Sequence, residues 1–288
     1  MGEYVWFHDV SWHSAYAIYF FVVGILAGLS FLSYGSWTTP ALRPLREKAA
    51  YVSVVLLGVG GVLLIGDLSQ PLRFLNTLNP MYMNFTSPLA WGALNIAAFG
   101  ICSVLYIIAL RKGDEKRGKL LALVTAVLAL GLPIYTGYDL SVHQSRPVWN
   151  TPAMPVLFVA LAFASGSAVG SLLAGSNDAA QKVLREYMLW SSAAVGIVLI
   201  GMMGTTNYGG TTEELTYQIL TSGTMGLIFV GFGILAGIAA PVALMALVPV
   251  SGGKNMGVLT IAAVLILIGS AALRYGILMA PQQVQTLF

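Results

Sequence analysis

The sequence is poor in charge. Only 9% of its 288 residues are Asp, Glu, Lys or Arg, whereas 57% are hydrophobic. An ordinary soluble domain has about 25% charged residues. Fourteen basic and eleven acidic side chains can cover only short loops, so a water-soluble globule is excluded. The 32 glycines suit membrane helices, whose backbones approach closely at small residues. The composition predicts an all-α, polytopic integral membrane protein.

Cysteine and histidine are also scarce. The single cysteine, Cys102, excludes a disulfide framework and an iron–sulfur cluster held by this chain, which would need about four thiolates. A membrane haem commonly has two histidines facing each other across the bundle, but His8, His13 and His143 all fall outside the apolar windows. We therefore expect no metal, haem or iron–sulfur cluster here. No P-loop, dinucleotide fingerprint, HExxH or GxSxG motif occurs, and nothing suggests a nucleic-acid partner.

Apolar windows of about 20 residues predict membrane-spanning helices. We expect one polytopic domain over 1–288 with eight spans, arranged as two four-helix bundles and surrounded by lipid. The seventh window is long enough to tilt or bend at Pro241. Pairs such as Gly24/Gly28, Gly166/Gly170 and Gly233/Gly237 predict close helix crossings. The expected spans are approximately 14–34, 49–68, 89–110, 119–140, 153–174, 186–205, 219–247 and 257–279.

Basic residues gather in alternate loops, which predicts the orientation in the membrane. The positive-inside rule places these loops in the cytoplasm and both termini outside the inner membrane. The basic residues of the cytoplasmic loops would be Arg43, Arg46, Lys48, Arg111, Lys112, Lys116, Arg117, Lys119, Lys182, Arg185 and Lys254, whereas the opposite face would receive only Arg73, Arg146 and Arg274.

Most chemically active side chains fall on the predicted outer face. Asp67 and Arg73 follow the second span, and Asp139 ends the fourth. Ionisable groups near hydrocarbon are costly and usually pair or face a cavity. Asp67 and Arg73 are therefore either an ion pair at the lipid headgroups or groups beside a redox site. In the second case Asp67 accepts a proton, and the Arg73 guanidinium tunes the pKa of its carboxylate.

Tyrosines mark the outer ends of the fourth and first spans. Tyr135 follows Pro133, and its phenol can donate to a buried carbonyl oxygen; an interfacial aromatic belt is the alternative. Tyr16 and Tyr19 share a face of the first span because they are three residues apart, with Trp12 and His13 just before them. An aromatic belt explains this group equally well.

A stiff segment, RPVWNTP, connects spans four and five at 146–152. It presents a cation, an indole and an amide through Arg146, Trp149 and Asn150. From its composition it is as readily a plain turn as a binding site.

Taken in order, several short motifs resemble those of the NrfD-like family, the membrane subunits of polysulfide reductase and its relatives. These motifs are GDLSQPLRF at 66–74, SPLAWG at 87–92, YTG at 135–137 and RPVWNTPAMP at 146–155. Each is weak alone, and the resemblance rests on the set and covers nearly the whole chain.

The resemblance implies a haem-free anchor that binds menaquinone or ubiquinone at its outer face. It also implies a ferredoxin-like iron–sulfur subunit and a molybdopterin-containing catalytic subunit as partners, and it allows a dimer of the whole complex. Without a metal of its own, the chain would take part in electron transfer by holding a diffusible carrier near a partner's cofactor.

Residue by residue, Tyr135 matches a tyrosine proposed to bind a quinone carbonyl, and Asp67 matches a carboxylate position beside the pocket. Tyr16 and Tyr19 stand where an asparagine and a histidine are found in the polysulfide reductase subunit, so the second quinone oxygen would be held by His13 or either tyrosine. We assign quinone binding to Tyr135, His13, Tyr16, Tyr19, Trp12, Trp149 and Asn150, and proton transfer to Asp67, Arg73, Asp139, Arg185 and Arg274.

The rival interpretation is a proton channel or secondary transporter without quinone chemistry, with Asp67, Asp139, Arg185 and Arg274 along its path. Charges in alternating-access transporters cluster near the midplane, whereas these lie mostly at the boundaries. Neither interpretation identifies the terminal substrate, the quinone type or the direction of electron flow.

Overall fold

The computed structural model describes residues 14–66, 76, 79, 81, 83–247 and 255–281, and all regular structure in these ranges is helical. Eight of the described helices are long and apolar enough to cross a membrane, so the prediction of eight spans is confirmed. The elements are α1 (Ser14–Gly35), η1 (Pro40–Leu45), α2 (Arg46–Gly66), α3 (Pro88–Arg111), α4 (Glu115–Ser141), α5 (Ala153–Ala174), α6 (Asp178–Asn207), α7 (Thr211–Thr221), α8 (Gly223–Gly226), η3 (Leu227–Ala239), α9 (Ala240–Leu247) and α10 (Met256–Met279).

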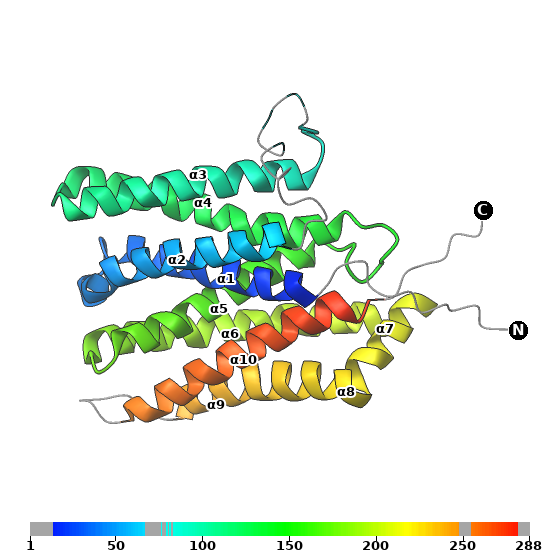
Figure 1. The fold of residues 1–288 in the computed structure, drawn as a ribbon. Coiled ribbons are helices and arrows are strands. Elements are labelled where there is room, and N and C mark those ends of the chain that lie inside the picture. The colour runs from blue at the N-terminus through cyan, green and yellow to red at the C-terminus, as the bar shows by residue number, and fades with distance from the viewer. Residues whose placement is uncertain are drawn as a thin grey trace, which may run out of the picture.

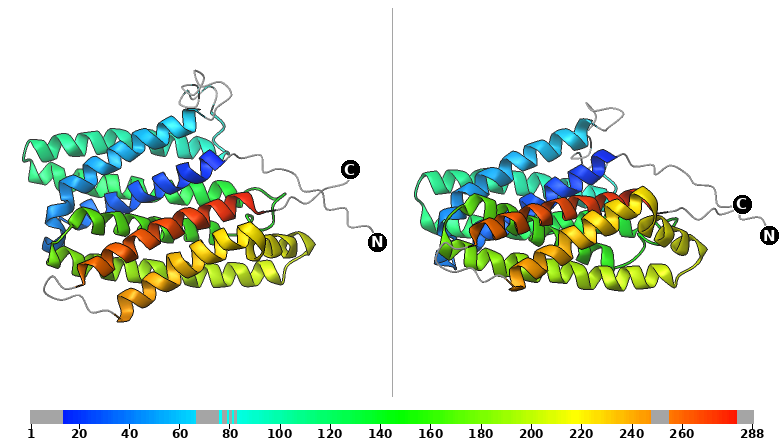
Figure 2. Two further views of the ribbon diagram at one scale, coloured as in Figure 1. Left: turned by 60° about the horizontal axis from the view of Figure 1, so that its bottom comes forward. Right: turned by 90° about the horizontal axis from the view of Figure 1, so that it is seen from below.

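The long helices lie side by side along one common direction (Figures 1 and 2). Helix α1 is central and packs against α2, α4, α5 and α10. We call one end of the bundle the basic end, where α1 passes to α2, α3 to α4 and α5 to α6; it lies on the left in Figure 1. The opposite end, where α1 begins and α4 and α10 end, is called the tyrosine end.

Short polar caps and glycines form the turns at the basic end. The Asp114 side chain accepts from the backbone N–H of Arg117 at the start of α4, and the Asn177 side chain accepts from that of Ala180 at the start of α6. Gly113 and Gly175 lie before these caps with positive φ angles of 66° and 54°, which glycine adopts without a steric penalty. These turns reverse the chain within a few residues and make neighbouring helices antiparallel.

The seventh span differs from the expected single helix. Ser222 is extended, and Gly223 has a φ of 55°, so the chain breaks there and the span starts afresh at Gly223. Its middle, η3, is π-helical up to Ala240, whose N–H bonds to the carbonyl of Leu235. Pro241 follows directly; it has no N–H and its ring crowds the preceding turn. The seventh span therefore departs from an α-helix before Pro241, where its turns are wider.

Glycines bring helices into backbone contact, as the small-residue pairs predicted. A Cβ added at Gly237 of η3 would lie 2.2 Å from the Cα of Gly269 in α10. The last two spans can therefore approach this closely only because both positions are glycine.

Candidate functional site

Two tyrosine hydroxyls meet near the tyrosine end of α1 and α4. The Oη atoms of Tyr19 and Tyr135 are 2.6 Å apart, and either can be the donor. Tyr19 is buried with 3% exposure, whereas Tyr135 is partly exposed. We call Tyr19 and Tyr135 the tyrosine pair. The structure thus joins two of the residues predicted from the sequence, which lie 116 positions apart.

Glycines on two further helices lie against the pair, and one of them makes room for it. A Cβ added at Gly92 of α3 would lie 2.4 Å from Cε2 of Tyr135, so the ring rests directly on this glycine. A Cβ at Gly60 of α2 would be in ordinary contact with the Tyr19 ring at 3.6 Å. The site is therefore built by α1, α2, α3 and α4 together. The motif SPLAWG contains Gly92, but sequence reasoning did not identify its role, because the neighbour that requires a glycine is on another helix.

One of the two O–H donors of the tyrosine pair is not used within the pair. Each phenol carries one O–H and can also accept. One O–H is used between the two oxygens, so the other remains to bind an external acceptor. Tyr16, three residues before Tyr19, packs against the same hydrophobic core as Tyr135. The arrangement can offer one directed O–H to a carbonyl oxygen in apolar surroundings.

A carboxylate and an imidazole follow Tyr135 towards the tyrosine end. Asp139 lies four residues after Tyr135 on the same face of α4, and His143 lies just beyond the end of this helix. Asp139 is only 5% exposed. The Nδ1 of His143 lies 2.7 Å from the backbone oxygen of Asp139. Titratable groups thus lead from the tyrosine pair to the end of the bundle.

The loop between α4 and α5 is fastened to the rest of the bundle. Trp149 is 1% exposed and donates its indole N–H to the carbonyl of Ile277 at 2.7 Å. Arg146 lies over the Trp149 ring at 4.7 Å and donates to the carbonyl of Pro281 at 2.8 Å. Burial lowers the pKa of the Arg146 guanidinium, since the charged form loses solvation. The Trp149 donor is thus already engaged in holding α10.

Asn150 has a similar internal partner. Its Nδ2 donates to the carbonyl of Ser141 at 2.6 Å, closing the turn after α4. The described contacts of Trp149 and Asn150 do not include the tyrosine pair.

Arg274 lies on the other side of α1, in the packing between α1, α5 and α10. It is 1% exposed, and its NH1 donates to Ser270. Its Nε and NH2 have no hydrogen-bond partner among the described residues. The guanidinium sits 5.8 Å from the ring centre of Phe158, against Gly24, where a Cβ would collide with NH2.

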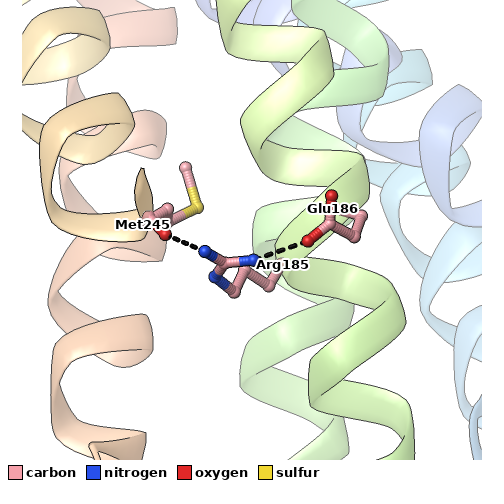
Figure 3. A network of polar contacts seen from close by, with 3 residues as sticks. All are labelled: Arg185, Glu186 and Met245. Atoms are coloured by element: carbon pink, nitrogen blue, oxygen red, sulfur yellow. Dashed lines mark hydrogen bonds and ion pairs between the residues drawn. The ribbon is translucent and has the colours of Figure 1, made fainter. Parts of the chain in front are cut away.

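Arg185 lies near the start of α6, and this helix begins at the basic end. Figure 3 shows the contacts of Arg185. Its NH1 bonds the carboxylate of Glu186 at 2.5 Å, and its NH2 donates to the backbone carbonyl of Met245. That carbonyl belongs to the last turn of α9, where backbone oxygens have no partner within the helix. The observed geometry is that of a side chain capping a helix end.

Four predicted site residues, Trp12, His13, Asp67 and Arg73, lie outside the described residues. Within the described ranges, no three His, Cys, Asp or Glu side chains are grouped so as to hold a metal ion.

The comparisons with known proteins all point to one family. The model of the family described as "Polysulphide reductase, NrfD" matches residues 5–285. One of the chains of polysulfide reductase from Wolinella succinogenes is 28% identical over 98% of this chain and 97% of its own length. One of the subunits of tetrathionate reductase from Salmonella typhimurium is 27% identical over 70% of this chain and 61% of its own. Protein NrfD of Escherichia coli is 30% identical over 57% of this chain and 59% of its own.

Proposed function

This chain belongs to the NrfD polysulphide reductase family, and we propose that it is the haem-free, quinone-reactive membrane subunit of a multi-subunit oxidoreductase. In this role it exchanges electrons between menaquinone or ubiquinone and an iron–sulfur subunit, which serves a molybdenum catalytic subunit. The terminal substrate is bound by that other subunit.

The observation that carries the proposal is the tyrosine pair. Its 2.6 Å contact uses one phenol proton and leaves one O–H for a carbonyl oxygen, which fits the polar edge of a quinone headgroup. The partly exposed Tyr135 is the donor to this oxygen, and the buried Tyr19 fixes the direction of its hydroxyl. A bound quinol supplies two electrons and two protons.

Proton movement is assigned to the groups that follow Tyr135. Asp139 lies one helical turn towards the tyrosine end and accepts a proton; His143, just beyond the end of α4, passes it outward. The predicted roles of His13, Trp12, Asp67 and Arg73 stay predictions, because these residues lie outside the described ranges. The roles of Arg185 and Arg274 in proton transfer stay predictions.

The orientation follows from the charges. We place the basic end in the cytoplasm and the tyrosine end outside the inner membrane, because basic connecting segments are retained inside. Arg46, Arg111 and Lys112 lie at the basic end. The iron–sulfur partner then docks at the outer, tyrosine end. The packing of α1 with α2 and α4, and of α10 with α5 and η3, supports two four-helix bundles within one membrane domain.

Quinol oxidation by the purified complex tests the proposal, with Tyr135→Phe as the variant. Phe keeps the ring on Gly92 but removes the O–H, so kcat/KM for a menaquinol analogue should fall about tenfold. The matched control is Tyr187→Phe, because Tyr187 of α6 is 44% exposed and lies away from α4.

Bound quinone and partner subunits are measured in the same preparations by mass spectrometry. The proposal expects the Tyr135→Phe complex to keep its partners while quinol turnover falls. Wild-type turnover in Tyr135→Phe, or a wild-type complex that contains no quinone and oxidises no quinol, would contradict it.

A further inference from the structure

A small polar cavity lies inside the first four spans, nearer the basic end. Its volume is about 10 Å³, counted as the space open to the centre of a water-sized sphere. One bound water needs about 10–15 Å³ by this measure, so the cavity fits one water molecule. We call it the hydroxyl cavity; its lining residues are Ser30, Ser33, Ala50, Ser53, Ser103, Tyr106, Ala122 and Thr125.

Two hydroxyls in the hydroxyl cavity have no partner among the described residues. Ser103 of α3 and Thr125 of α4 are 3% and 4% exposed, and neither Oγ of Ser103 nor Oγ1 of Thr125 makes a hydrogen bond there. Buried polar groups are nearly always hydrogen-bonded to protein or to ordered water. Two unsatisfied hydroxyls facing the same small space indicate a missing partner that touches both.

The remaining hydroxyls are bonded and supply further contacts. The Oγ atoms of Ser30 and Ser53 lie 3.4 Å apart, and each hydroxyl also donates to a backbone carbonyl of its own helix. The Ser33 and Tyr106 hydroxyls are 2.9 Å apart. Each of these four hydroxyl oxygens can still accept a further hydrogen bond, because a hydroxyl oxygen accepts up to two.

Polar contacts continue from the hydroxyl cavity to the basic end. Trp37 donates its indole N–H to the Tyr106 hydroxyl at 3.1 Å. Ser33 donates to the backbone carbonyl of Arg46 at 2.8 Å, and the Arg46 guanidinium lies 3.6 Å from the Trp37 ring centre. The cavity is thus connected by hydrogen bonds to the boundary where solvent begins.

An apolar layer separates the hydroxyl cavity from the tyrosine pair. Val23 and Leu26 lie between Tyr19 and Ser30 on one face of α1, at spacings of three and four residues. Phe99 precedes Ser103 by one turn of α3, and Ala129 and Leu132 lie between Thr125 and Tyr135 on α4. All five layer residues are at most 2% exposed and pack in one core cluster. An amide near this level, that of Asn95, donates to the carbonyl of Leu128.

We propose that the hydroxyl cavity is a water-binding site, in which one water molecule joins Ser103 Oγ and Thr125 Oγ1 to the Ser30/Ser53 hydroxyls. The site forms a hydrated compartment that is connected to the basic end and sealed from the tyrosine pair by Val23, Leu26, Phe99, Ala129 and Leu132. Groups at the tyrosine pair therefore exchange protons towards the tyrosine end. The water site itself does not depend on the proposed function.

Thermal unfolding distinguishes a hydrated from a dry cavity. If a water is bound, Ser103→Ala and Thr125→Val each remove one of its partners, and each should lower Tm by about 2 °C. The double variant should lower Tm by less than the sum of the two, because both hydroxyls share one water. If the cavity is dry, each variant removes an unsatisfied hydroxyl and Tm rises, which would overturn the proposal.

Ser165→Ala is the matched control. Ser165 of α5 is fully buried, but its hydroxyl already donates to the carbonyl of Leu161 at 2.7 Å and lies outside the cavity. Its Tm should stay near the wild-type value.

A cryo-electron microscopy map of the wild-type complex, at a resolution that shows ordered water, gives an answer without any variant. The expected result is a density peak about 2.7–3.2 Å from both Ser103 Oγ and Thr125 Oγ1. An empty cavity, with both hydroxyls turned to the carbonyl four residues earlier in their own helices, would overturn the proposal.

Discussion

Gly28 of α1 and Gly166 of α5 lie in backbone contact: a Cβ added at Gly166 would stand 2.4 Å from the Cα of Gly28. Helix α1 belongs to the first half of the chain and α5 to the second. Their contact brings the two halves as close as two helices can pack, and it lies on the side of α1 where Gly24 meets Arg274 of α10.

Gly166→Ala should therefore weaken the packing of α1 against α5, which connects the two halves of the chain. Overfilling a packed interface costs about 1–3 kcal/mol, because the added methyl meets backbone that cannot turn away. Thermal unfolding in detergent measures the loss. Gly58→Ala in α2 is the control, since a Cβ there meets nothing within 4 Å; equal Tm values for the two variants would contradict this account of the crossing.

Gly92→Ala should disturb the tyrosine pair without touching a polar group. The added methyl would lie 2.4 Å from the Tyr135 ring, so the ring must move and its hydroxyl with it. We expect kcat/KM for quinol to fall about tenfold, as for loss of the phenol itself. Gly100→Ala, on the same helix but against the flexible Leu57 side chain, should keep wild-type turnover.

Asp139→Asn should slow quinol turnover by about 100-fold if the carboxylate accepts a proton, since positioned general bases contribute at least that factor. The amide keeps the size of the side chain but cannot take up a proton. Steady-state kinetics with a quinol analogue measure the effect. Asp139→Glu should recover part of the rate, and an Asn variant as active as the wild type would remove Asp139 from the mechanism.

Trp149→Phe should affect stability and leave quinol binding unchanged. The indole N–H is engaged by the carbonyl of Ile277 near the end of α10, and its loss should cost about 1–3 kcal/mol. Thermal unfolding and the KM for quinol are compared in one preparation. A raised KM at unchanged Tm would instead place Trp149 in contact with the quinone.

Arg185→Met should loosen the contact between α6 and α9. Met keeps much of the length of the side chain, but the carbonyl of Met245 loses its donor, at a cost of about 1 kcal/mol. If Arg185 serves only to cap α9, quinol turnover should remain at the wild-type rate, because the contact lies at the opposite end from the tyrosine pair. Turnover that falls without loss of stability would support the proton-transfer role that the family resemblance suggests.

The spans were predictable because each depends on a local property, a run of apolar residues as long as the membrane is thick. The break at Gly223 was not, since Ser222 and Gly223 lie inside an apolar window and only their backbone angles show that the helix stops. For the site, the sequence identified Tyr19 and Tyr135 as separate candidates. Gly92 was missed because its role depends on a ring from α4, and the composition does not show which ring that is.

The sequence alone determined that this protein has eight segments long and apolar enough to cross a membrane, has a single cysteine and collects its basic residues in alternate loops, because composition and hydrophobic length need no knowledge of neighbours. Only the tertiary structure decided that Tyr19 bonds Tyr135, that the Trp149 indole is committed to α10 and that Ser103 and Thr125 face one small cavity. These relationships join residues on different helices, and the rotation of each helix about its axis is set by close packing, which no single segment specifies.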